Sequence, residues 1–269
     1  MSELLQIKKR INSIHKINKI TNVMEIISIS KTAKLKQLFL NNIDFQNNLY
    51  KCIAALKIND TNSSQVKLWV VFSGSLGMAG NYNINTFKKI KENIKTNDKI
   101  IVFGERGYKF VKKETMKYED TLNIKTEEKH FAFFEYKYVS DYIARLYLLN
   151  KIGSLSLIYT KYKDNKIKTD VVEVLPITKE FNEQNKNEVL YNFEQDTKHI
   201  FKKILPFYLE SIIYSALIES KLSENIARKN AMVEANNNIE ENIRELSIKY
   251  NKKRQEKITS ESERRVNND

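Results

Sequence analysis

The first part of the chain carries apolar residues at the spacing of a long helix. They are Leu4, Ile7, Ile11, Ile14, Ile17, Ile20, Met24 and Ile27. Up to Ile14 the steps are three and four residues, and after Ile17 the pattern resumes one residue out of phase and continues less regularly to Leu56. Steps averaging about 3.5 residues predict a coiled-coil helix, and the change of phase predicts a local discontinuity in its apolar seam.

The last part of the chain shows a similar pattern. Its apolar stripe comprises Ile239, Ile243, Leu246 and Tyr250, and smaller residues extend it backwards at Ala227, Ala231 and Ala235. Small side chains allow a partner helix to approach closely. We therefore expect the two terminal helices to pair with each other as an antiparallel coiled coil.

Between these helices, apolar runs of strand length alternate with helical stretches. The expected strands are residues 66–73, 99–103, a weaker one near 117–122, and a hairpin of 155–162 with 166–175. The expected helices are 84–94, a short one ending at 112, and 136–150. This alternation predicts a small open α/β sheet with an antiparallel edge. Residues 178–187 are polar and are expected to form a surface loop.

The distribution of helix-breaking residues supports the same organisation. The chain has 269 residues but only 6 glycines and 2 prolines, and all of these lie between Gly74 and Pro206. Two long segments without helix breakers therefore flank a middle that contains the turns. The expected domains are an N-terminal helix over 1–58, a globular domain over 66–190 and a C-terminal helix over 207–266.

The net charge of +13 is concentrated on the first helix. Residues 1–58 carry ten Lys/Arg and three Asp/Glu, a balance of +7, whereas residues 207–269 carry eleven of each. Such a charge is typical of proteins that bind nucleic acid, an anionic membrane surface or an acidic protein. Cys52 is the only cysteine, which rules out an intrachain disulfide. No run of 18 apolar residues and no signal peptide is present, so we place the chain in the cytoplasm.

Gly74, Gly77 and Gly80 follow an expected strand and precede a helix, which is where nucleotide-binding loops occur. Their spacing fits neither a phosphate-binding loop, which requires a Lys-Ser or Lys-Thr pair, nor a dinucleotide fingerprint. The three histidines His15, His130 and His199 show no metal-ligand spacing. We therefore predict no catalytic, cofactor-binding or metal-binding residues, and interpret the chain as a non-enzymatic rod that binds partners through its helices.

Several motifs resemble those of the gamma subunit of F-type ATP synthases. Residues 7–14 read IKKRINSI and residues 19–26 read KITNVMEI, similar to the N-terminal signature of that family. Residues 222–228 (LSENIAR) and 250–259 (YNKKRQEKIT) resemble its C-terminal motifs, and residues 77–85 (GMAGNYNIN) its glycine-rich loop. Their order and spacing hold over essentially the whole chain.

The resemblance implies a central shaft in a rotary motor. The implied fold is a long antiparallel coiled coil of the terminal helices plus a small open Rossmann-like α/β domain. The implied partners are a ring of alpha- and beta-type subunits that bind the nucleotide, an epsilon-like stalk subunit and a membrane rotor ring, with no nucleic acid. The complex would then lie against the inner face of the cell membrane. The implied partner-binding residues are Lys8, Lys9, Arg10, Lys19, Met24, Glu25, Arg228, Arg254 and Gln255, with Lys31 as a further basic contact.

The sequence also departs from the family pattern. Ser75 and Leu76 stand where the family has an acidic-basic pair, and the chain ends in a polar segment where the family has an apolar tail. Three alternatives therefore remain open at this point. They are a gamma-like shaft of a second F-type-like motor that drives work such as surface motility, a basic coiled-coil nucleic-acid-binding protein, and an enzyme with a nucleotide site at residues 74–80.

Overall fold

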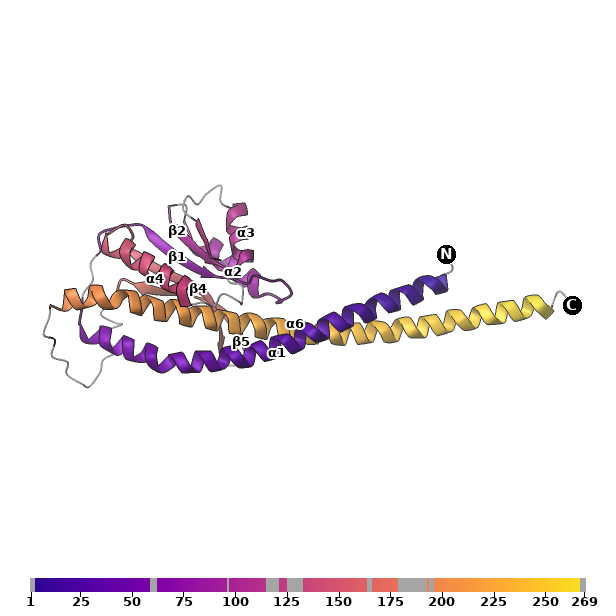
Figure 1. The fold of residues 1–269 in the computed structure, drawn as a ribbon. Helices are drawn as coiled ribbons and strands as arrows, with labels where there is room; N and C mark the ends of the chain where they lie inside the picture. Colours follow the sequence, from indigo (N-terminus) through magenta and orange to yellow (C-terminus); the bar gives the residue numbers. More distant parts are fainter. Residues whose placement is uncertain are drawn as a thin grey trace. The chain divides into compact units, whose positions relative to one another are not determined.

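The computed structural model describes residues 3–58, 62–95, 97–114, 121–124, 133–163, 166–178, 193 and 196–266. In chain order the elements are α1 (Glu3–Ala55), β1 (Lys67–Phe72), α2 (Tyr82–Asn93), β2 (Lys99–Phe103), α3 (Glu105–Glu114), β3 (Thr121–Ile124), α4 (Phe133–Leu148), β4 (Ser154–Lys163), β5 (Lys166–Leu175) and α6 (Thr197–Val266) (Figure 1). His130 and most of the expected loop at 178–187 lie outside the described residues.

The chain forms two compact units. Unit 1 combines the residues up to Ser30 with those from Arg228 onward, and unit 2 is Lys31–Ala227. Both boundaries lie inside helices, so α1 and α6 each contribute to both units. The domain boundaries predicted from the sequence follow the helices and the insert instead, and they stay a prediction.

Within the described residues, unit 2 contains a five-stranded sheet in the order β3-β2-β1-β4-β5. The central strand β1 pairs in parallel with β2 on one side and with β4 on the other, while β5 runs antiparallel to β4 at the edge. Val70 at the middle of β1 lies opposite Ile101 of β2 and Leu157 of β4. The predicted small open sheet with an antiparallel edge is confirmed.

The two faces of β1 belong to two different cores, because successive side chains of a strand point to opposite faces. Leu68, Val70 and Phe72 pack in a core that includes residues of α4 and α6, such as Ile143 and Leu209. The other face of the sheet, with Trp69 and Val71, is covered by α2 and α3 (Figure 1). Unit 2 therefore has α2 and α3 on one face of the sheet and α4 and α6 on the other, where residues of α1 such as Ile53 and Leu35 also pack.

Helix α6 begins at Thr197 rather than at residue 207, where the prediction placed its start after the proline. Pro206 lies inside the helix, where a proline removes one backbone hydrogen bond and normally costs about 3 kcal/mol. The surrounding side chains Phe201, Leu205 and Tyr208 are buried in the unit 2 core. Burial of these side chains offsets the cost of the proline. Local helix propensity alone therefore does not predict that the helix begins before Pro206.

Unit 1 is an antiparallel pair of helices. The Glu25 carboxylate of α1 accepts a hydrogen bond from Asn236 Nδ2 of α6 at 2.8 Å, and Glu3 lies 3.6 Å from Lys253. Residues nearer the start of α1 therefore contact residues nearer the end of α6, so the two helices run in opposite directions. This confirms the predicted antiparallel coiled coil. Among the helices of the described residues, none is both long and apolar enough to cross a bilayer.

Buried polar side chains attach α6 to the sheet and its loops within unit 2. Ser223 Oγ donates a hydrogen bond to the carbonyl of Thr160 in β4 at 2.9 Å. The Tyr82 hydroxyl of α2 lies 2.6 Å from Ser220 Oγ. The residues that directly follow these serines, Lys221 and Glu224, form an ion pair within α6 at 2.8 Å, with side chains only 9% and 4% exposed. The hydrogen bonds of Ser220 and Ser223 fix which face of α6 meets the sheet and α2.

An exposed ion pair of the same spacing and length elsewhere in unit 2 serves as a control for this buried one. Lys89 and Glu92 of α2 are also three residues apart and 2.8 Å apart, but their side chains are 37% and 41% exposed. We expect Lys221→Met to lower the free energy of unfolding by about 3 kcal/mol, because it removes the cation that lies 2.8 Å from the buried Glu224 carboxylate. Lys89→Met should cost less than about 1 kcal/mol. Urea unfolding followed by the fluorescence of Trp69, the single tryptophan, measures both. Equal losses for the two variants would contradict the role of burial.

Candidate functional site

The seam of unit 1 keeps one phase along the described part of α1. After Ile7, Ile11 and Ile14 it continues through Asn18, Thr21, Glu25 and Ser28, again at steps of three and four residues. Thr21 is 7% exposed and Ser28 is 1% exposed. The predicted continuation of the seam through Ile20 and Ile27 is therefore wrong, since these two side chains are 60% and 41% exposed. We call residues 18, 21, 25 and 28 the polar seam.

The polar seam satisfies its hydrogen bonds incompletely. Thr21 Oγ1 donates to the carbonyl of Asn18 at 3.0 Å and Ser28 Oγ to that of Met24 at 2.7 Å, so both hydroxyls are bonded within their own helix. Two buried acceptors, Asn18 Oδ1 and Asn236 Oδ1, have no hydrogen-bond partner among the described residues. Such a group costs about 1–3 kcal/mol. This stretch of the coiled coil is therefore stabilised less than an apolar seam would be.

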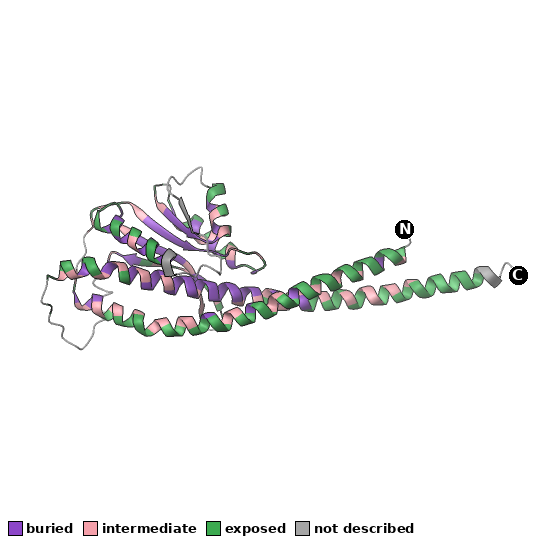
Figure 2. Ribbon diagram, in the orientation of Figure 1, coloured by how far each residue is buried: buried purple, intermediate pink, exposed green. Residues whose placement is uncertain are grey.

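The apolar side chains of the same stretch lie on the outside. They form what we call the outer face of α1, which consists of Ile17, Ile20, Val23, Ile26 and Ile27, between 41% and 66% exposed. Figure 2 shows that most of α1 in unit 1 is exposed. A contiguous apolar surface of this kind marks a site where a partner binds. Sequence reasoning missed it, but extending the steps of the first residues past Ile14 without a phase change would have found it.

The outer side of α6 opposite this stretch has a different chemistry. Glu234, Glu240, Glu241, Arg244 and Glu245 are all exposed. Unit 1 is therefore asymmetric about its long axis, because one helix presents isoleucine and valine outward and the other presents charges.

The predicted partner-binding residues of α1 occupy two kinds of environment. Lys8, Lys9, Arg10 and Lys19 are exposed and follow the outer surface of the helix. Met24 and Glu25 are half-buried, and the carboxylate of Glu25 is engaged by Asn236 within unit 1. Lys31, which belongs to unit 2, is also half-buried.

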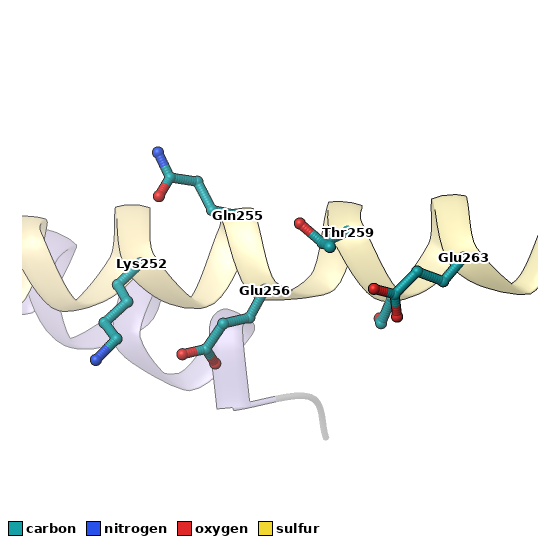
Figure 3. Close-up of a pocket in the computed structure, with 6 residues that line it drawn as sticks. Lys252, Gln255, Glu256, Thr259 and Glu263 are labelled. Carbon is teal, nitrogen blue, oxygen red and sulfur yellow. The ribbon is translucent and has the colours of Figure 1, made fainter.

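Of the two predicted residues near the end of α6, Gln255 lines an open hollow. Arg254 and Gln255 are both exposed. The hollow has a volume of about 470 Å³ and is lined by Lys252, Gln255, Glu256, Thr259, Ser260 and Glu263 (Figure 3). Figure 3 shows Gln255 pointing away from the side to which Lys252 and Glu256 point. The amide of Gln255 is thus directed outward from the coiled coil.

Lys253 stands next to Arg254 but has a structural role. Its ammonium lies 3.1 Å from the carboxylate of Glu256 and 3.6 Å from that of Glu3 on α1. The hydrogen bond to Glu256, with the charges of both carboxylates, raises the pKa of Lys253 above its ordinary value. Arg228 is different again, because it is only 5% exposed. Its predicted role as a partner contact stays a prediction.

The glycine-rich loop after β1 is braced by side chains of unit 2. The backbone N–H of Gly74 donates to Asn83 Oδ1 at 3.0 Å, and a Cβ added to Gly74 would lie 3.1 Å from the buried carboxylate of Glu224. A Cβ on Gly77 would lie 2.8 Å from the guanidinium of Arg106. Among the described residues, no three His, Cys, Asp or Glu side chains come together as a metal site requires.

Comparison with known proteins places the chain in a family. A family model described as ATP synthase matches residues 3–262. The ATP synthase gamma chain of Malacoplasma penetrans is 31% identical over 97% of this chain and 96% of its own length, and that of Mycoplasmopsis pulmonis is 32% identical with the same coverage.

Solved structures share the fold. A chain in the rotor of the Euglena gracilis mitochondrial ATP synthase has a TM-score of 0.70 at 18% identity and covers 95% of this chain and 98% of that chain. In the OSCP/F1/c-ring structure of the same enzyme the TM-score is 0.72 at 18% identity, with 98% and 92% covered. The relatives confirm the resemblance inferred from the terminal motifs and support it over the alternatives. The chain belongs to the ATP synthase gamma chain family.

Proposed function

We propose that this gamma chain is the non-catalytic rotating shaft of its ATP synthase. Unit 1 stands inside a ring of alpha- and beta-type subunits, which bind the nucleotide and carry out the chemistry. An epsilon-like stalk subunit and a membrane rotor ring complete the rotor, and the chain reaches the inner face of the membrane through this complex. The structurally similar chains come from a rotor and from an OSCP/F1/c-ring assembly, which supports these partners.

The outer face of α1 is the observation that carries the proposal. Side chains that are about half exposed each leave roughly 1 kcal/mol of burial unused, and a surrounding sleeve of apolar side chains would supply it. The hydrophobic effect has no preferred direction and depends on the area removed from water. An apolar shaft can therefore turn within such a sleeve without breaking a fixed set of directional bonds at each step.

Because unit 1 is asymmetric, each surrounding subunit would contact a different surface of the shaft as it rotates. At any one angle, one neighbouring subunit meets the isoleucines of α1 and another meets the charges of α6. Exposed lysines and arginines such as Lys8 and Arg10 suit acidic loops of the surrounding subunits. Arg254 and Gln255 supply directional hydrogen bonds that are formed at some angles and lost at others. Each catalytic site would thus experience a different contact from the same shaft.

The braced loop after β1 supports the absence of catalysis on this chain. A nucleotide site at that position would need free backbone N–H groups and a positive environment for phosphate. Here the N–H of Gly74 is already bonded to Asn83, and the carboxylate of Glu224, only 3% exposed, lies beside the glycine. The carboxylate, which is ion-paired with Lys221, thus occupies the space beside Gly74 that a phosphate would need.

The purified chain should therefore hydrolyse no ATP. Adding it to purified alpha- and beta-type subunits should raise their multi-site turnover. Phosphate release, measured for the chain alone, for the subunits alone and for the mixture, tests both statements. Hydrolysis by the isolated chain that persists through further purification steps would falsify the non-catalytic assignment.

The outer face should determine how tightly the chain binds its ring. We expect Val23→Ser with Ile26→Ser to weaken binding to the alpha- and beta-type subunits by about 30-fold, because two half-exposed side chains lose about 2 kcal/mol of burial. Serine has a helix propensity close to that of valine and isoleucine, so the free helix should be unaffected. Titration of the fluorescently labelled chain measures the affinity.

Asn22→Ser is the matched control, since Asn22 is an exposed polar residue on the same stretch of α1. It should leave the affinity unchanged. If the double variant binds as tightly as the control, the outer face does not contact the ring.

The contacts of Arg254 and Gln255 should affect turnover rather than assembly. Each hydrogen bond to a charged group contributes about 1.5–3 kcal/mol, so loss of a contact made at only some angles should slow the assembled motor about tenfold or more. We expect Arg254→Ala with Gln255→Ala to have this effect, and Lys249→Ala, another exposed residue of α6, to have none. ATP turnover and torque of the complex are the measurements. Wild-type turnover in the assembled double variant would show that these residues are not torque contacts.

A further inference from the structure

Residues 17–28 of α1 contain two rows of residues at steps of three and four, either of which could pack against α6. In the structure only one of these seams does so. The polar seam is Asn18, Thr21, Glu25 and Ser28. Subtracting one residue from each position gives Ile17, Ile20, Met24 and Ile27, which we call the alternative seam. One residue of an α-helix corresponds to a rotation of about 100° about its axis. The two seams therefore differ by a rotation of that size between α1 and α6, with no change in the spacing of the contacts.

The balance between the two seams is close, because each has a favourable and an unfavourable side. The polar seam keeps the phase of Ile7, Ile11 and Ile14 and preserves the hydrogen bond between Glu25 and Asn236. It leaves Ile17, Ile20 and Ile27 exposed, however, together with the unpaired acceptor of Asn18. The alternative seam would bury these side chains against α6 and return Asn18 to water, but it would lose the bond to Asn236 and introduce a phase change near residue 15.

We propose that in the free chain residues 17–28 exchange between these two packings, and that cover of the outer face by surrounding subunits selects the polar seam. The second part rests on the proposed function, whereas the first concerns the chain alone. A partner that binds only one of two conformations shifts the population towards it by its difference in affinity. A ring that covers Ile20 and Ile27 binds the polar-seam packing, because only that packing places them outside.

Disulfide trapping distinguishes the packings without any partner. Cys52 is the only cysteine, so the background is Cys52→Ser. In this background Asn236→Cys is combined with Glu25→Cys, Met24→Cys or Ile26→Cys. In the polar-seam packing Met24 is half-buried and Ile26 is 66% exposed, so a cysteine at 24 starts closer to α6 than one at 26. The ratio of the 24–236 to the 26–236 crosslinking rate is therefore compared with the same ratio in a reference chain that also carries Asn18→Leu and Thr21→Leu, whose polar seam is apolar.

Exchange raises this ratio in the free chain, because the alternative seam turns position 24 towards α6 and position 26 further away. We expect the ratio to be at least about tenfold higher than in the reference chain, while 25–236 also forms. Equal ratios in the two chains would overturn the exchange. Non-reducing electrophoresis over a time course of oxidation measures all three.

The reference chain also separates exchange from simple loosening of the helices. Circular dichroism should show the same helix content in both chains, so a lower ratio in the reference chain reflects the choice of seam. Loosening in place of exchange would raise the 24–236 and 26–236 rates together, and this result would overturn the proposal.

In the assembled complex the ratio should also fall to that of the reference chain, and a ratio as high as in the free chain would overturn the selection by partners. Failure of the complex to form would count against the proposed function, and the free-chain comparison would still decide the exchange.

Discussion

The continuity of α1 is the constraint on which the organisation of unit 1 depends. An unbroken helix changes the phase of its contacts only by twisting locally, which favours continuing the seam set by Ile7, Ile11 and Ile14 through residues 18, 21, 25 and 28 despite their polar side chains. Polar side chains are consequently placed between the helices and isoleucines outside them. Packing of the two helices leaves these isoleucines in water, and the proposed ring of subunits would cover them.

The fold of unit 2 was largely predictable because its signals are local. The run from Leu68 to Phe72 is apolar on both faces, as a central strand requires, and in the sequence the polar pair Asp164-Asn165 lies between the two runs that form β4 and β5. The start of α6 was not predictable, since Pro206 ends a helix in most contexts and only the burial of Leu205 and Tyr208 overrides it. The burial of the ion pair between Lys221 and Glu224 could not be predicted either, because the exposed pair of Lys89 and Glu92 has the same spacing in the sequence.

The candidate site was predictable in part. The terminal motifs led to Arg254 and Gln255, which are exposed as a contact requires, and to Arg228, which is buried. The outer face was misassigned, because isoleucine at helical spacing is usually a core signal and Ile20 and Ile27 have that spacing. A helix that serves a partner on one side and its own chain on the other carries two overlapping patterns. Of these two patterns, the one with unbroken steps of three and four residues, the polar seam, is the pattern that packs against α6.

The central claim is that surrounding subunits cover the outer face of α1 in the working complex. A single cysteine at position 23 in the Cys52→Ser chain tests it through its rate of reaction with a maleimide, with a cysteine at the exposed position Lys112 of α3 as the reference. The account predicts that assembly with alpha- and beta-type subunits slows labelling at position 23 by at least about tenfold, the effect of about 1.4 kcal/mol of protection. Labelling at the same rate in the free chain and in the complex would contradict it.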